Sequence, residues 1–241
     1  MEIAQAALWV VVMLVALAVL FDFMNGFHDA ANSIATVVST GVLKPTQAVV
    51  FAAFFNVVAY FVFHLSVAAT VGKGIVQPGV VDVNVVFGAL AGAITWNVIT
   101  WYYGIPSSSS HALIGGIVGS VIAKAGAGSL IASGIWKMVL FIFVSPLLGF
   151  ILGSLMMVLV AWICRRTSPG RIDKWFRRLQ LLSAGAYSLG HGGNDAQKTI
   201  GIIWLLLLST GYASASDPNP PTWAVVACYT AIGLGTMFGG W

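Results

Sequence analysis

The sequence is poor in charged residues and in cysteine, and both shortages narrow the class of protein. Only 7% of its 241 residues are charged and 59% are hydrophobic, whereas soluble domains average about 25% charged residues. A domain folded in water could not bury so much apolar surface, so the composition excludes a soluble protein and predicts a polytopic membrane protein. The two cysteines, Cys164 and Cys228, lie far apart and do not indicate a disulfide framework.

The motifs of an enzyme and of a nucleic-acid-binding protein are also missing. The sequence has no Gly-x-Ser-x-Gly elbow and no nucleophile or metal-ligand spacing, so we expect no enzymatic activity, no cofactor and no resident metal. The net charge of +4 does not indicate a nucleic-acid partner, because six of the eleven basic residues lie in one short loop. Those six residues are Arg165, Arg166, Arg171, Lys174, Arg177 and Arg178.

Long apolar runs predict an all-α fold, because about 20 apolar residues cross a bilayer as a helix. We expect spans at 3–24, 46–71, 85–103 and 134–164, with further apolar runs at 181–208 and 222–241. The first span is retained, since no small-residue cleavage site of a signal peptide follows it. Two shorter runs, 30–42 and 112–123, are too short to cross comfortably, and they predict broken or re-entrant helices.

The basic segment 165–180 sets the expected orientation. Ile172, Trp175 and Phe176 recur there at helical spacing among Arg and Lys, which predicts a short amphipathic helix at the membrane surface. The positive-inside rule places the loop 165–178 in the cytoplasm. We therefore expect a multi-pass protein of the plasma (inner) membrane, in contact with lipid; a homodimer is compatible with the sequence.

Two polar stretches interrupt the apolar sequence and resemble each other. Residues 26–34 (Gly-Phe-His-Asp-Ala-Ala-Asn-Ser-Ile) align with residues 192–200 (Gly-Gly-Asn-Asp-Ala-Gln-Lys-Thr-Ile) at an offset of 166. Interrupted hydrophobic segments in matching positions point to the binding site of an inverted-repeat transporter. We predict a first repeat at 1–163, a basic amphipathic linker at 164–180 and the start of a second, incomplete repeat at 181–241.

The acidic residues of the two stretches are the strongest candidates for a functional site. Asp29 and Asp195 lie among amides and hydroxyls, which suits a hard cation such as Na⁺ or a proton relay; a hydrogen-bonded clamp between helices is the structural alternative. The predicted cation or proton-coupling residues are His28, Asp29, Asn32, Asn194 and Asp195. Secondary candidates are Asn25, Ser33, Thr199 and Lys198.

The basic side chains near these carboxylates have more than one interpretation. His28 could carry a proton during transport, or it could remain a neutral hydrogen-bonding imidazole. We interpret His64 and His191 as mainly structural. Lys198 could attract an anion, but an ion pair with Asp195, three residues earlier on a helix, is the favoured interpretation.

A serine-rich segment predicts the complementary anion site. Pro106 favours the first turn of a helix, and the free N–H groups and positive dipole of a helix N-terminus bind small oxyanions. The predicted anion-binding residues are Ser107, Ser108, Ser109, Ser110 and His111. The alternative is a serine-rich turn with simple capping.

Together these motifs resemble the inorganic phosphate transporter (PiT) family, over nearly the whole chain. The resemblance rests on residues 26–32, on residues 188–198 (Ser-Leu-Gly-His-Gly-Gly-Asn-Asp-Ala-Gln-Lys) and on the Pro-Ser-Ser-Ser-Ser-His segment at 106–111. The bacterial low-affinity branch is most similar, because it also has a His-Asp pair in the first motif.

The resemblance implies symport of inorganic phosphate with a cation, by alternating access of two inverted repeats. His28 favours H⁺ over Na⁺, and in this branch the phosphate can travel as a neutral complex with a divalent metal. The offset of 166 predicts a second serine motif at 273–277, beyond Trp241, so we expect a C-terminally truncated member. The alternatives are a carrier of another oxyanion such as sulfate, a channel, or a non-transporting fragment or scaffold.

Overall fold

The computed structural model describes residues 7–63, 74–77, 79–214 and 219–240, and it is almost entirely helical in these residues. Its regular elements are α1 (Leu8–Ser39), α2 (Pro45–Val62), α4 (Val83–Tyr102), α5 (Ser109–Ala125), the short 3₁₀ turn η1 (Ala127–Ser129), α6 (Ala132–Cys164), α7 (Pro169–Ser209) and α8 (Thr222–Gly239). Five of them, α1, α2, α4, α6 and α8, are long and apolar enough to cross a membrane. The expectation of an all-α polytopic membrane fold is confirmed.

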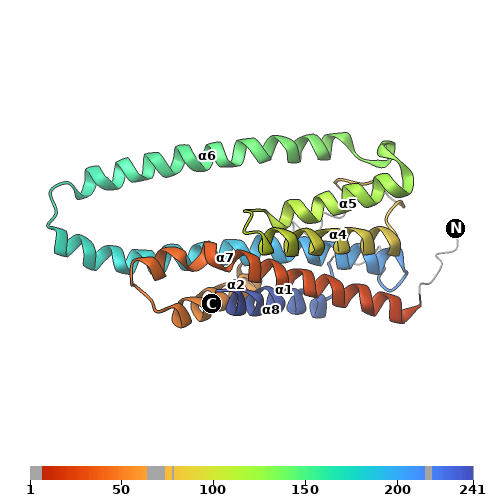
Figure 1. Cartoon of the computed structure of the whole chain (residues 1–241), viewed down its shortest axis with the longest axis horizontal. Helices are drawn as coiled ribbons and strands as arrows, with labels where there is room; N and C mark the ends of the chain where they lie inside the picture. Colours follow the sequence, from red (N-terminus) through yellow and green to blue (C-terminus); the bar gives the residue numbers. More distant parts are fainter. Residues whose placement is uncertain (1–6, 64–73, 78, 215–218, 241) are drawn as a thin grey trace.

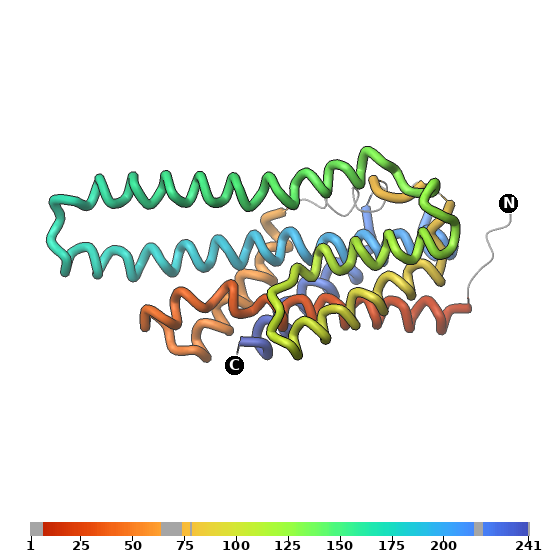
Figure 2. Tube along the Cα trace, turned by 45° about the horizontal axis from the view of Figure 1, so that its top comes forward, coloured from red at the N-terminus to blue at the C-terminus, as the bar shows by residue number. Residues whose placement is uncertain are grey.

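The helices form a bundle with one helix at its edge. Helices α1, α2, α7 and α8 pack together, and α4 and α5 form a hairpin against α1. Helix α6 runs along one side of the bundle in both views (Figures 1 and 2), and none of its described side chains is buried. The polar stretches of the sequence therefore lie in the packed part of the molecule.

Helix α1 is continuous through the first polar stretch, so the predicted break near residue 30 is wrong. A helix pairs its backbone groups internally, and polar side chains on one face can find partners on neighbouring helices without any break. Gly26 also serves packing, because a Cβ at this position would collide with the backbone oxygen of Ile232 on α8. Gly235 of α8 meets the backbone of Phe23 in the same way, as is typical of small residues between membrane helices.

Helix α7 is likewise continuous, for 41 residues. The sequence predicted a separate amphipathic helix at 165–180 and a break in the second polar stretch, and both expectations are wrong. The only proline of α7 is Pro169, at its first turn, where proline is well tolerated. Without a later proline, the basic segment and the apolar segment join in one helix.

The remaining spans follow the predictions closely. Helix α4 matches the span expected at 85–103, and α6 covers 134–164 as one helix with Pro146 inside it. Helix α5 is short, with 17 residues, and begins at the serine motif. The expected second span begins as predicted, but α2 ends at Val62; His64 and the rest of that span lie outside the described residues.

Candidate functional site

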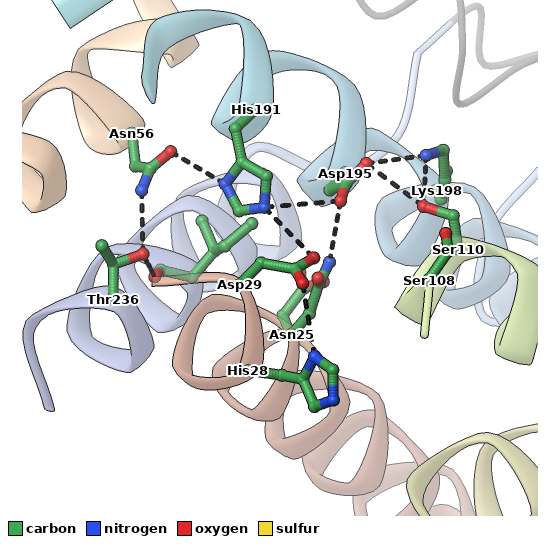
Figure 3. Close-up of polar contacts among 12 residues, drawn as sticks. Asn25, His28, Asp29, Asn56, Ser108, Ser110, His191, Asp195, Lys198 and Thr236 are labelled. Carbon is green, nitrogen blue, oxygen red and sulfur yellow. Dashed lines mark hydrogen bonds and ion pairs between the residues drawn. The ribbon is translucent and has the colours of Figure 1, made fainter. Parts of the chain in front are cut away.

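The two polar stretches meet inside the bundle. Asp29 of α1 and His191 and Asp195 of α7 each offer one atom to a cluster whose atoms all lie within 4.8 Å of one another. His191 Nε2 lies 3.6 Å from Asp29 Oδ2 and 3.5 Å from Asp195 Oδ2 (Figure 3). We call these three residues the acidic cluster; its two carboxylates and one imidazole can surround a single small cation or share a proton.

A chain of hydrogen bonds fixes the orientation of the His191 ring. Thr236 Oγ1 donates to the backbone oxygen of Ile232 at 2.9 Å, so it accepts the hydrogen bond from Asn56 Nδ2 at 2.9 Å. The other amide atom, Asn56 Oδ1, then accepts a hydrogen bond from His191 Nδ1 at 3.3 Å. Because Nδ1 carries a hydrogen, a neutral His191 points the lone pair of Nε2 at the two carboxylates.

His28 approaches Asp29 from the opposite side. Its Nδ1 lies 3.3 Å from Asp29 Oδ1, and its Nε2 lies 3.4 Å from Thr100 Oγ1. A carboxylate only accepts hydrogen bonds, so the neutral tautomer that fits these contacts donates from Nδ1 to Asp29 and accepts at Nε2 from Thr100. Asp29 thus lies between two ring nitrogens, and its contact with His191 is the one that lacks a hydrogen while the imidazoles are neutral.

Asp195 has a different environment, rich in donors. Lys198 Nζ lies 2.7 Å from Asp195 Oδ1, which is the ion pair expected from the sequence. Asn25 Nδ2 donates to Asp195 Oδ2 at 3.3 Å, and Ser110 Oγ donates to Asp195 Oδ1 at 3.3 Å. Lys198 also donates to Ser110 Oγ at 2.5 Å, so the N-terminus of α5 is tied directly to the carboxylate (Figure 3).

The serine motif is divided between different roles. Ser108 caps α5 and accepts from the N–H of His111 at 3.4 Å, while Ser107 accepts from the Trp96 indole at 2.9 Å and so points toward α4. Ser109 is buried, and its hydroxyl has no partner among the described residues. Of the four serines, Ser110 is the one whose contacts reach the acidic cluster.

Several predicted residues are not brought to the acidic cluster. Asn32, Asn194 and His111 are exposed, and no described contact joins the first two to Asp29 or Asp195. Ser33 is buried without a described hydrogen-bond partner, and Thr199 donates instead to Asp22. Asn25, His28 and Lys198 are the predicted companions that do contact the two carboxylates.

Sequence reasoning missed the contribution of His191, which was interpreted as mainly structural. Its position four residues before Asp195 places both on the same helical face, and this spacing was the available signal. Asn56 and Thr236, which orient its ring, come from α2 and α8 and are far away in the sequence. No local pattern connects them.

Comparisons with known proteins identify the family of the chain. Residues 25–241 match the family model described as "Phosphate transporter family". A relative from Rhizobium meliloti (strain 1021), named "Probable low-affinity inorganic phosphate transporter", is 55% identical over 99% of this chain and 71% of its own length. A relative of the same name from Bacillus subtilis (strain 168) is 46% identical over 95% of this chain and 69% of its own length.

A solved structure has the same fold. It is described as "The sodium-dependent phosphate transporter", is 22% identical, and superposes with a TM-score of 0.86 over 97% of this chain and 76% of its own. At that identity the likeness establishes the fold, while the family model and the bacterial relatives carry the family assignment. The chain therefore belongs to the phosphate transporter family, and it is a membrane-embedded protein and not an enzyme.

Proposed function

We propose that this protein is a secondary active transporter that moves inorganic phosphate together with a cation, by alternating access, with H⁺ favoured over Na⁺. The proposal builds on the family and on the names of the bacterial relatives. The acidic cluster is the cation site of the proposal, and the N-terminus of α5 is its phosphate site.

The observation that carries the choice of H⁺ is the arrangement of hydrogens around Asp29. His28 Nδ1 and His191 Nε2 both face this carboxylate, and His191 already donates through Nδ1 to Asn56. A proton on Asp29, or on Nε2 of His191, supplies the hydrogen that the contact between these two residues lacks. Na⁺ is a hard cation that prefers oxygen ligands, so two ring nitrogens are a poorer environment for it.

The net charge of the site supports the binding of one cation. Among the described residues, Asp29 and Asp195 contribute two negative charges and Lys198 one positive charge, which leaves one negative charge when both imidazoles are neutral. Buried charges need compensation. A single bound monovalent cation neutralises the site, and with phosphate alone the site would become still more negative.

For phosphate we propose the N-terminus of α5 with Ser108, Ser109 and Ser110, assisted by Lys198. Backbone N–H groups at a helix N-terminus and a nearby ammonium both stabilise an oxyanion. Ser110 and Lys198 bond each other and both bond Asp195. An arriving phosphate would compete for these donors, which gives a direct physical link between binding of the anion and the charge of the acidic cluster.

The directions of the helices support an inverted repeat with the predicted boundaries 1–163, 164–180 and 181–241. Helices α1 and α7 carry the two matching motifs and run in opposite directions (Figures 1 and 2). We propose that the basic segment 165–178, which includes the start of α7, lies in the cytoplasm and that the protein resides in the plasma (inner) membrane.

Uptake of labelled phosphate into proteoliposomes tests the proposal. We expect accumulation driven by an inward H⁺ gradient and little accumulation driven by a Na⁺ gradient. Ser110→Ala should raise the KM for phosphate, and Ser107→Ala, whose hydroxyl bonds Trp96, should raise it less. If neither the H⁺ gradient nor the Na⁺ gradient drives uptake, cation-coupled transport is refuted.

Two further arms of that assay identify the transported species. Competition by unlabelled sulfate separates a phosphate carrier from a general oxyanion carrier, and we expect phosphate to compete far better. Uptake with and without a divalent metal separates free phosphate from metal phosphate. Stronger competition by sulfate than by phosphate would replace the proposed substrate.

A further inference from the structure

A second acidic residue lies in the interior of the bundle, and the proposed mechanism does not yet use it. Asp22 of α1 has 0% of its surface exposed. It precedes Asp29 by seven residues, which is two helical turns or about 10 Å along α1. Its Oδ1 accepts a hydrogen bond from Thr199 of α7 at 2.5 Å. Its Oδ2 is buried and has no hydrogen-bond partner among the described residues.

No basic residue pairs with Asp22 in the described part of the chain. The groups facing it are the Thr199 hydroxyl on α7 and the Cys228 thiol and Tyr229 on α8. The charged groups that act on it from a greater distance are Asp195 and Lys198. The ammonium of Lys198 is already bonded to Asp195 and to Ser110. Asp22 is therefore a buried carboxyl group without a counter-ion of its own.

An ionised carboxylate in this position would be expensive. Burial of an unpaired ion carries a penalty of several kcal/mol even after relaxation, and such groups usually become neutral instead. The neutral acid fits the observed contacts, because Oδ1 accepts from Thr199 and Oδ2 carries the hydrogen. The hydrogen is therefore placed on Oδ2, which no nitrogen or hydroxyl donor of the described residues reaches; the Cys228 thiol is the other hydrogen-bonding group beside Asp22.

We propose that Asp22 is a second proton-binding site, which holds its proton in this conformation and gives it up in the transport cycle. This inference rests on the proposed H⁺-coupled function. The O–H bond at Asp22 forms with a proton from water on one side of the membrane, and it breaks by returning the proton to water on the other side. Thr199 lies one turn beyond Asp195, so movement of α7 against α1 changes both proton sites together.

The second repeat offers a matched control. Applying the offset of 166 to Asp22 gives Ser188 of α7, which is also buried but cannot titrate, and which bonds the backbone oxygen of Ala184. Ser188→Ala therefore removes a buried polar group from the equivalent position without removing a proton site. We expect this variant to behave as wild type in every measurement below.

The test combines two transport measurements with infrared spectroscopy, on the full chain in liposomes. Exchange of internal for external phosphate needs no net proton movement, whereas accumulation under an inward H⁺ gradient does. Asp22→Asn mimics the neutral acid, so we expect it to retain exchange and to reduce gradient-driven accumulation to the level seen without a gradient. The infrared carbonyl band of a protonated carboxylic acid should be present in the wild type and weaker in Asp22→Asn.

Gradient-driven accumulation at the wild-type level in Asp22→Asn, or an unchanged carboxylic acid band, would overturn the proposal. If Asp22→Asn does not fold, Asp22→Glu decides: it should preserve coupling and shift the band, and an unshifted band would overturn the assignment. If the wild type accumulates no phosphate under an H⁺ gradient, the coupled function fails. The infrared band still reports separately whether Asp22 holds a proton.

Discussion

Asp29 and Asp195 occupy matching positions in the two polar stretches, yet their surroundings differ. Asp195 is bonded by the ammonium of Lys198 and by neutral donors from Asn25 and Ser110. Asp29 lies between two imidazoles and has no ammonium partner among the described residues. The first stretch has Asn32 where the second has Lys198, so the counter-ion of Asp195 has no equivalent beside Asp29.

This difference suggests different roles for the two polar stretches. The carboxylate with a permanent counter-ion stays ionised and anchors the N-terminus of α5, where phosphate is proposed to bind. In the proposed mechanism, the carboxylate without a counter-ion is the one that exchanges its cation during each cycle. The two similar stretches thus supply the carboxylates of the proposed site, and the residues that differ between the stretches give each carboxylate its own surroundings.

Removal of the Lys198 charge should have the largest effect, because it erases the difference between the two copies. Breaking a buried ion pair leaves an uncompensated charge and costs about 3–5 kcal/mol, so we expect Lys198→Met to lower the thermal unfolding midpoint in detergent markedly. The double variant with Asp195→Asn should recover much of that stability but not the transport. A Lys198→Met protein as stable as the wild type would contradict the assigned ion pair.

Substitution of the two histidines should reduce H⁺-driven uptake to different extents. His191 contacts both carboxylates and His28 contacts only Asp29. Once a proton is bound, His191 donates a hydrogen bond to a carboxylate, and losing a hydrogen bond to a charged group costs about 1.5–3 kcal/mol, roughly 10- to 100-fold in an equilibrium constant. We expect His191→Gln to reduce H⁺-driven uptake by a factor in that range and His28→Gln to reduce it less. An equal or larger loss in His28→Gln would reverse the roles given to the rings.

A second Lys–Asp ion pair lies at the edge of the bundle, and its loss should have the smallest effect on stability. Lys124 Nζ lies 2.9 Å from Asp82 Oδ2, just before α4 begins. Partial burial acts to raise the pKa of Asp82, but the Lys124 ammonium and the Val85 N–H bring that pKa below its usual value. The stabilisation is therefore present above the pKa of the unfolded chain and is lost as the pH falls through the folded pKa.

Asp82→Asn retains a capping side chain for α4 but removes the charge. We expect it to lower stability by about 0.5 kcal/mol at neutral pH, because exposed pairs contribute only about 0–1 kcal/mol, and to have no effect at a pH low enough to protonate Asp82. Thermal unfolding in detergent across this pH range measures the difference. A loss at neutral pH as large as that of Lys198→Met would show that burial does not distinguish the two pairs.

The sequence predicts the membrane spans and the meeting of the two polar stretches because both depend on local patterns. A run of 20 apolar residues is typical of a membrane-spanning helix. The Asp195–Lys198 pair follows from the spacing of the two residues along one helix. The continuity of α1 and α7 was not predictable, because partners on neighbouring helices satisfy the polar side chains that had suggested a break.

The finer arrangement of the site depends on tertiary contacts. Four consecutive serines look equivalent in the sequence. In the structure, Ser107 is hydrogen-bonded by Trp96 of α4 and Ser110 by Lys198 of α7. The role of His191 depends on the orientation that Asn56 and Thr236 impose on its ring. Asp22 precedes the first aligned stretch by one turn of α1, yet it is bonded by Thr199 of α7 and not by the acidic cluster. Such choices are decided by packing between distant segments.

The most direct test of the central claim is H⁺-driven phosphate uptake by Asp29→Asn, Asp195→Asn and the double variant. If the two copies build one cation site, each single variant should abolish coupled uptake, and the double variant should be no worse than either one. Retention of near wild-type coupled uptake in either single variant would contradict the claim that both carboxylates form the site.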